Sequence, residues 1–229
     1  MTSIIDGIKS AFDLLLSFDK EIYSIIGLSI YVSLTSTIIS SILAIPIGIV
    51  LGIKTFPGKK AIVRVLYTMM SLPPVIVGLV VYLFISRNGP LGNLRIVYTP
   101  TAIIVAQVFL VVPIIAGSVY SGARERGEEI QDLAYTLGAN KGQALILLIR
   151  ELRVNIFSAI VTGYGRSISE VGAVMVVGGN IKGHTRVMTT TIAMLKNMGQ
   201  YGMAIAIGII LLLISFVINS MLYRLQKED

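Results

Sequence analysis

Apolar residues fill most of this 229-residue chain in runs long enough to cross a lipid bilayer. A helix rises about 1.5 Å per residue, so roughly 20 apolar residues span a hydrocarbon core of about 30 Å. The runs predict five membrane-spanning helices, at residues 22–53, 61–86, 100–119, 156–177 and 202–222. The third begins with a helix start signal, because Thr99 can cap it and Pro100 suits its first position. The pattern therefore predicts an all-α, multi-pass membrane protein.

Residues 1–20 follow a different pattern. Apolar residues such as Ile4 and Ile8 recur at helical spacing, while Asp6, Lys9 and Asp13 interrupt any continuous apolar run. This pattern is typical of an amphipathic helix that lies on the membrane surface. We do not expect a secretory signal, because no basic region precedes the segment and no small-residue cleavage site follows it.

Composition supports a membrane protein and narrows its chemistry. Hydrophobic residues make up 55% of the chain and charged residues 14%, and the mean hydropathy is +0.84, which exceeds what a soluble domain of this size buries. The absence of cysteine excludes disulfides, thiolate metal sites and cysteine nucleophiles. A single histidine, His184, argues against a histidine metal cluster. We predict no metal site and no cofactor in this chain.

Cations predict the orientation of the chain in the membrane. The nineteen Lys and Arg residues outnumber twelve acids, which fits either an anionic partner or the cationic cytoplasmic loops of membrane proteins, and we favour the loops. One set of loops and the C-terminus carry Lys54, Lys59, Lys60, Arg64, Arg124, Arg126, Lys141, Arg150, Arg153, Arg224 and Lys227. The other side carries fewer, namely Lys9, Lys20, Arg87, Arg95, Lys182, Arg186 and Lys196. We therefore expect the N-terminus outside and the C-terminus inside.

Small residues and prolines within the spans indicate close packing or kinks. Two sets recur every four residues, Ser29, Ser33, Thr37 and Ser41 in the first span, and Gly165, Ser169 and Ala173 in the fourth. Such a face lets another helix approach closely. Pro46, Pro73, Pro74 and Pro113 lie in or beside spans. These prolines suit either a transport pathway or plain packing.

Two opposite charges lie in the middle of the fourth apolar run, in RSISEVGAVM at residues 166–175. Arg166 and Glu170 are four residues apart and can pair on one helix face, with Ser169 beside them. Neither charge can face lipid, so they face the helix bundle, a subunit interface or an aqueous cavity. We interpret the group as a buried pair that fixes helix geometry, with contact to a substrate in a pathway as the alternative.

The third loop, residues 122–153, is longer than an ordinary connection and is regularly patterned. It predicts a short helix at residues 128–137, a stop at Gly138, and a second helix that rises from Lys141 into the fourth span. A helical hairpin at the cytoplasmic surface is suited to docking by another protein.

The hairpin sequence DLAYTLG resembles a known family signature. Asp132, Ala134 and Gly138 match the acid, alanine and glycine of the EAA---G motif in permease subunits of ABC importers of the type I fold. The resemblance extends over nearly the whole chain. It departs where the family often has leucine and proline, since Arg150 and Glu151 stand there. The run SEVGAVMVVGGNIKGHTRVMTTTIA, residues 169–193, is similar to tungstate permeases, which are related to molybdate permeases.

The resemblance implies a transport subunit rather than an enzyme. Residues 21–225 would form the transmembrane domain of an importer in a prokaryotic cytoplasmic membrane. The implied partners are a second copy of the chain, a cytoplasmic ATPase dimer that binds ATP and Mg²⁺ and docks on the hairpin, and an extracytoplasmic binding protein, with no nucleic acid. Alternating access would carry an oxyanion, tungstate by the closer resemblance, with molybdate or another small anion as the alternative.

The segment GGNIKGHT, residues 178–185, has the glycine spacing of a phosphate-binding loop, but His184 replaces the lysine. We interpret it as a turn before a short outer helix that is capped by Thr185 and passes through Met188. Hydroxyl and amide groups suit a tetrahedral dianion, so Asn180, Thr185 and Thr189 are named as possible pathway or gate residues.

Two other classes of protein fit the sequence less well than an importer subunit. A secondary transporter often shows an internal repeat, and none is found in these spans. A membrane enzyme needs a reactive constellation, whereas this chain has one histidine, no cysteine and no acid cluster within a span.

Overall fold

The computed structural model describes Leu16 and residues 20–227, so the amphipathic helix predicted for residues 1–20 lies outside the described part except for Leu16 and Lys20. The elements are α2 (Lys20–Ile53), α3 (Lys59–Met70), α4 (Pro74–Ile85), the 3-10 turn η1 (Gly92–Leu94), α5 (Pro100–Thr136), α6 (Lys141–Glu151), α7 (Arg153–Ile168), α8 (Gly172–Gly178), α9 (Met188–Asn197) and α10 (Tyr201–Lys227). Every regular element over these residues is a helix. The all-α prediction is confirmed.

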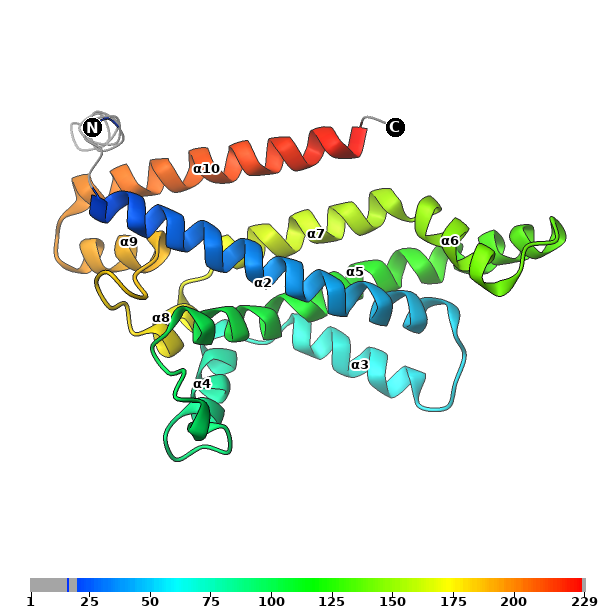
Figure 1. Ribbon diagram of the computed structural model, residues 1–229, viewed down its shortest axis with the longest axis horizontal. Coiled ribbons are helices and arrows are strands. Elements are labelled where there is room, and N and C mark those ends of the chain that lie inside the picture. The colour runs from blue at the N-terminus through cyan, green and yellow to red at the C-terminus, as the bar shows by residue number, and fades with distance from the viewer. Residues whose placement is uncertain (1–15, 17–19, 228–229) are drawn as a thin grey trace.

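The long helices lie side by side along the longest axis of the molecule (Figure 1). The turn from α5 to α6 forms one end, whereas α9 and the start of α2 form the other. Helix α4 runs across this axis and projects from the bundle. The start of α2 and the last turn of α10 face opposite ends, which is the arrangement that an odd number of spans requires.

Helices α2 and α5 approach closely, and two glycines of α2 lie where they meet. Ser29, Ser33, Thr37 and Ser41 are all buried, as their spacing predicted. A Cβ atom at Gly48 would lie 2.7 Å from the Cβ of Val119, and one at Gly52 would lie 2.4 Å from the Cβ of Ala123. Glycine is therefore required at both positions, because either contact is shorter than packed carbon atoms allow.

The small-residue face predicted for the fourth span is confirmed at Ala173, which is buried and whose Cα would lie 2.6 Å from a Cβ atom at Gly78 of α4, and it is wrong at the other two positions. A Cβ atom at Gly165 would meet nothing within 4 Å, and Ser169 is exposed. The close contact is made instead by Gly163, where a Cβ atom would lie 2.8 Å from the side chain of Ile115 on α5. The predicted four-residue repeat crosses the end of α7 at Ile168, which the sequence pattern did not reveal.

Two predicted spans are broken in the structure. Helices α3 and α4 meet at a bend of 104°, because Pro73 and Pro74 end the first helix and start the second. The fourth span divides into α7 and α8 at residues 169–171. Within the described residues three helices are long and apolar enough to cross a membrane, or four if the bent pair counts as one. The count of five spans stays a prediction.

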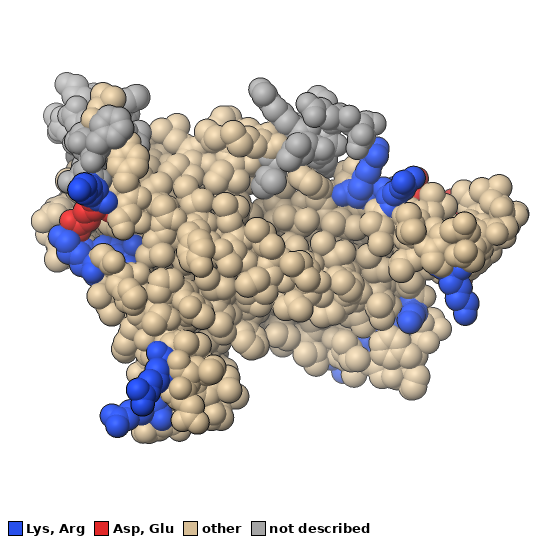
Figure 2. All heavy atoms as spheres, viewed as in Figure 1, with Lys and Arg blue, Asp and Glu red and all other residues tan. Residues whose placement is uncertain are grey.

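On the face drawn in Figure 2, charged side chains avoid the middle of the bundle. Figure 2 shows Lys, Arg, Asp and Glu gathered toward the two ends of the long axis and at the projection below α4, with a broad uncharged surface between them. Uncharged side chains over the middle of a bundle suit contact with hydrocarbon, and charges at the ends suit contact with head groups and water.

Candidate functional site

The break between α7 and α8 is held by Glu170, whose side chain is 3% exposed. One carboxylate oxygen accepts a hydrogen bond from the Ala173 backbone N–H at 3.0 Å. The other lies 3.1 Å from the guanidinium of Arg166. The hydroxyl of Thr189 on α9 donates to the Glu170 carbonyl at 2.9 Å. Glu170 thus joins the end of α7 to the start of α8 and to α9.

The two members of this ion pair differ in their surroundings. The Arg166 side chain is 34% exposed, whereas Glu170 is almost completely buried. A guanidinium carries five N–H donors, and one Arg166 nitrogen contacts the carboxylate. The pair predicted from the sequence is present, and it leaves part of the guanidinium accessible from outside the protomer.

A second buried network lies beside the pair and links α2, α5 and α7. The Gln107 amide nitrogen donates to the Ser167 carbonyl at 3.0 Å, and its oxygen accepts from the Ser36 hydroxyl at 2.9 Å. The hydroxyls of Ser36 and Ser167 are 2.8 Å apart. Either hydroxyl can donate this bond, because the single hydrogen of Ser36 also has the Gln107 oxygen and the Ser33 carbonyl, at 3.1 Å, as acceptors.

Gln107 and its serine partners were not predicted as site residues. A signal was present for Gln107, which is the one amide side chain in the apolar run of residues 100–119. The Ser167 carbonyl, in the last turn of α7, accepts this bond together with one from the Glu170 backbone N–H at 3.2 Å. The network therefore supports the irregular backbone that follows.

The space inside these networks is too small for a substrate. A volume of about 10 Å³ remains between Ser29, Ser33, Gln107, Ser167, Glu170 and Thr189. That volume is at the lower limit of roughly 10–15 Å³ needed for a single water molecule. A tetrahedral oxyanion cannot pass through this part of one protomer.

The outer face of α7 offers a polar surface instead. Ser158, Thr162 and Ser169 are exposed on the same face of the helix as Arg166. The hydroxyls of Thr162 and Ser169 each bond a carbonyl four residues earlier, both at 2.8 Å. Polar side chains and an arginine on one face of an otherwise apolar helix cannot face lipid without a large cost. The face is therefore suited to line an aqueous path that lies outside the protomer.

The three residues named as possible pathway or gate residues have different positions. Thr189 is buried and bonded to Glu170, as described above. Thr185 is fully buried, accepts from the Ile181 N–H at 3.0 Å and donates to the Gly178 carbonyl. Asn180 has a left-handed backbone, with φ 52°. Thr185 and Asn180 shape the loop of residues 179–187.

The outer helix after this loop exists as α9, but its predicted cap is wrong. The helix begins at Met188 and its cap position is Val187, not Thr185. The hydroxyl of Thr190 accepts from the Val187 N–H at 3.1 Å. Thr185 is used instead to close the loop, because a tertiary contact with Gly178 outweighs the local preference for capping.

The predicted hairpin forms the far end of the bundle, at the turn between α5 and α6 (Figure 1). Gly138 has φ 82° and ends the helix, as predicted. The first helix of the hairpin is not separate, because α5 continues unbroken from Pro100 to Thr136. The second begins at Lys141 after a capping box between Asn140 and Gln143. It does not run directly into the fourth span, because Leu152 separates α6 from α7.

The signature residues of the hairpin differ in exposure. Asp132 and Gly138 are exposed, while Ala134 is 1% exposed and packs inside the hairpin. Large apolar side chains around them face outward, with Leu133 57%, Leu137 75% and Ile146 57% exposed. Apolar side chains exposed together at one end of a molecule are typical of an interaction surface.

The fold and the sequence place the chain in a class of transporter subunits. It resembles the crystal structure of a bacterial ABC transporter involved in the import of the acidic polysaccharide alginate, with a TM-score of 0.76, 19% identity, and 95% of this chain and 82% of that chain covered. The chain thus shares the fold of the matched chain of that transporter.

The chain belongs to the family described as the binding-protein-dependent transport system inner membrane component, whose sequence model matches residues 44–228. It is 54% identical over 228 residues to the tungstate uptake system permease protein TupB of Peptoclostridium acidaminophilum, with 100% of both chains covered. A TupB of Campylobacter jejuni is 33% identical, covering 98% of this chain and 94% of its own. A probable anion ABC transporter permease protein of Haloferax volcanii is 36% identical, covering 90% of each. The family resemblance read from the hairpin is confirmed.

Proposed function

We propose that this chain is the membrane subunit of an ATP-driven tungstate importer, in which a partner subunit hydrolyses ATP. The 54% identity to a tungstate uptake permease along the whole length carries this proposal. Two copies would form the pore, two ATPase subunits would dock inside, and a binding protein would deliver the anion outside. Molybdate or another small anion is the alternative substrate, because a tetrahedral dianion of similar size presents the same hydrogen-bond acceptors.

The proposed path lies between two copies, along the polar face of α7. Two observations support it: the interior networks of one protomer leave only about 10 Å³, and Arg166 stands partly exposed on that face. Arg166 would contact the passing oxyanion through the donors that Glu170 leaves open, since guanidinium groups bind oxyanions well. Glu170 would position Arg166 and prevent the anion from binding too tightly to leave.

Uptake by cells that express the permease with its ATPase and binding protein tests the proposal. Intracellular tungsten is measured by mass spectrometry, with molybdate and sulfate as competitors. We expect tungstate uptake that excess sulfate does not reduce, and Arg166→Gln should lower the uptake per permease molecule, with uptake normalised to the amount of permease in the membrane. Lys196→Gln, which removes an exposed cation from α9, is the matched control. Equal uptake of molybdate without tungstate preference would refute the substrate, and normal uptake by Arg166→Gln would refute the path.

The hairpin end is the proposed docking surface for the ATPase, with Asp132, Ala134 and Gly138 as its signature residues. Exposed apolar side chains at its tip and the buried position of Ala134 support this assignment. Asp132→Lys reverses a charge near the tip, whereas Glu125→Lys makes the same change on the same helix seven residues away and serves as the control. We expect the ATPase to copurify with the Glu125 variant and not with the Asp132 variant. Copurification with both would remove the support for this surface.

A further inference from the structure

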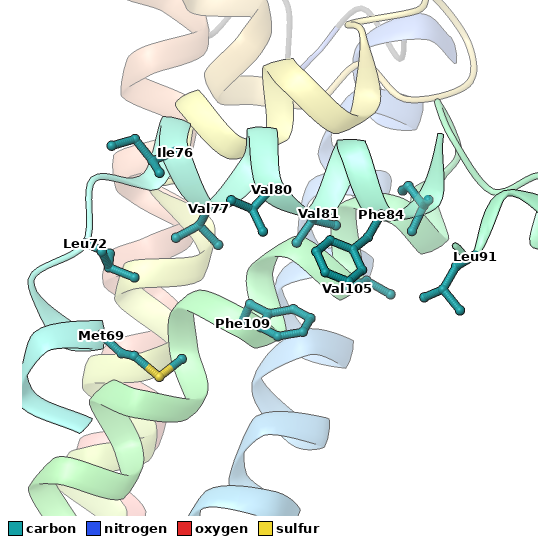
Figure 3. Close-up of a pocket in the computed structure, with 11 residues that line it drawn as sticks. Met69, Leu72, Ile76, Val77, Val80, Val81, Phe84, Leu91, Val105 and Phe109 are labelled. Carbon is teal, nitrogen blue, oxygen red and sulfur yellow. The ribbon is translucent and has the colours of Figure 1, made fainter. Parts of the chain in front are cut away.

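An apolar cavity of about 460 Å³ lies in the corner between α3, α4 and α5. Figure 3 shows Val77, Val80 and Phe84 along one side of α4, facing Phe109 of α5, with Met69 of α3 at one end. All eleven lining residues are apolar. The volume is within the roughly 300–1,000 Å³ of ordinary small-ligand sites. The bend of 104° between α3 and α4 creates this corner.

A second, polar cavity of about 690 Å³ adjoins the first at the end of α4. Ile85 lines both cavities, and Leu91 of the first is followed in the chain by Gly92 of the second. The polar cavity is lined by Arg87 and Arg95, which are both exposed. Within the described part of the chain no acid pairs with either arginine.

The polar cavity lies at a charged level of the molecule and the apolar cavity lies beside its uncharged part, and this order matches the head group and acyl chain of a lipid. In Figure 2 the cations on the projection below α4 lie at about the same level along the long axis as the charged group near the start of α2. That group includes the pair of Glu21 with Lys182, 2.7 Å apart. Charged side chains at one level of a membrane protein are typical of the head-group region. The apolar cavity extends from there along the uncharged part of the bundle.

We propose that these cavities form a binding site for an anionic phospholipid, with its phosphate on Arg87 and Arg95 and one acyl chain in the corner of α3, α4 and α5. An arginine pair at the head of an apolar groove matches the two chemical ends of such a molecule. Guanidinium groups bind a phosphodiester through paired N–H donors, which a lysine cannot do. The proposal does not depend on which anion the protein transports.

Judged by the residues that the structure describes, a lipid fits this corner better than a second copy of the chain. A second copy would have to place acids opposite Arg87 and Arg95. Outside the segment of residues 125–151 the described residues include two acids, and both are used: Glu21 pairs with Lys182 and Arg186, and Glu170 is buried with Arg166. A phosphate group supplies the missing charge.

Native mass spectrometry of the delipidated full-length protein tests the site. The probes are phosphatidylglycerol and phosphatidylcholine with identical palmitoyl and oleoyl chains. We expect phosphatidylglycerol to bind more tightly, and Arg87→Gln and Arg95→Gln each to weaken it by about fivefold, from the attraction of one basic residue for anionic lipid. Lys196→Gln is the control for charge and should leave binding unchanged.

The apolar half of the site is tested by Val80→Trp, which fills the cavity, against Leu79→Trp. Leu79 is the neighbouring exposed residue of α4 and does not line the cavity. We expect the Val80 variant to lose both lipids and the Leu79 variant to retain them. Equal affinity for the two lipids, or full competition by free glycerol phosphate, would overturn the proposal. So would dissociation of a dimer by Val80→Trp with no change in bound lipid, because a second copy would then fill the corner.

Discussion

Removing Arg166 and removing Glu170 should destabilise the protein to different extents, because the two side chains are unequally buried. Arg166→Gln leaves the carboxylate of Glu170, 3% exposed, without its cation. Breaking a buried pair in this way costs about 3 kcal/mol, the lower end of the usual range because Arg166 itself is partly exposed. Glu170→Gln keeps an oxygen that accepts from the Ala173 N–H and leaves a cation that water reaches. Its cost should be about 1–1.5 kcal/mol.

The double variant decides whether the pair acts as a unit. It leaves no unpaired charge, so we expect about 2 kcal/mol rather than the sum of about 4, which is a coupling of about 2 kcal/mol. In a protein of this size 1 kcal/mol shifts the melting temperature by about 2–4 °C. The assay is the loss of the monodisperse peak after heating in detergent. Additive effects, or equal losses in the two single variants, would refute the reasoning from burial.

Three further predictions concern the buried network, the hairpin and the orientation. Gln107→Leu should lower the melting temperature in the same assay by about 4–8 °C, because it removes the buried hydrogen bonds to Ser36 and Ser167 at a cost of about 2 kcal/mol. Gly138→Val should reduce ATPase copurification, since a β-branched residue resists φ 82°, whereas Gly165→Ala should have no effect because open space surrounds that position. Single cysteines at Ser3 and Glu228 should react from opposite sides of the membrane, and reaction from the same side would exclude an odd number of spans.

Local signals in the sequence predicted much of the fold. Apolar runs located the long helices, and Thr99 caps α5 through a bond from the Ala102 N–H at 3.3 Å. The left-handed backbone at Gly138 ends α5 as expected. The spacing of Arg166 and Glu170 predicted their pairing because residues four apart meet even where a helix ends between them. Each of these features depends on neighbours within a few residues.

The remaining features depend on partners distant in the chain. Gln107 meets Ser36 across 71 positions and Ser167 across 60, and a single sequence gives no means of finding such pairs. The end of α7 at Ile168 contains no proline, and it is fixed by contacts from Ala173 and Thr189 to Glu170. Apolar periodicity alone therefore merged α7 and α8 into one span.

The unbroken course of α5 has a mechanical consequence. This helix of 37 residues runs from the end of the polar α4–α5 connection to the exposed hairpin, about 55 Å at 1.5 Å per residue. Gln107 lies near one end of this rod, about 44 Å from Thr136 at the other. If the rod pivots near Gln107, a displacement of about 4 Å at the hairpin is only about a 5° tilt there, taken from that length. A rotation of about 5° at the amide that links α2 and α7 would thus correspond to a displacement of about 4 Å at the hairpin.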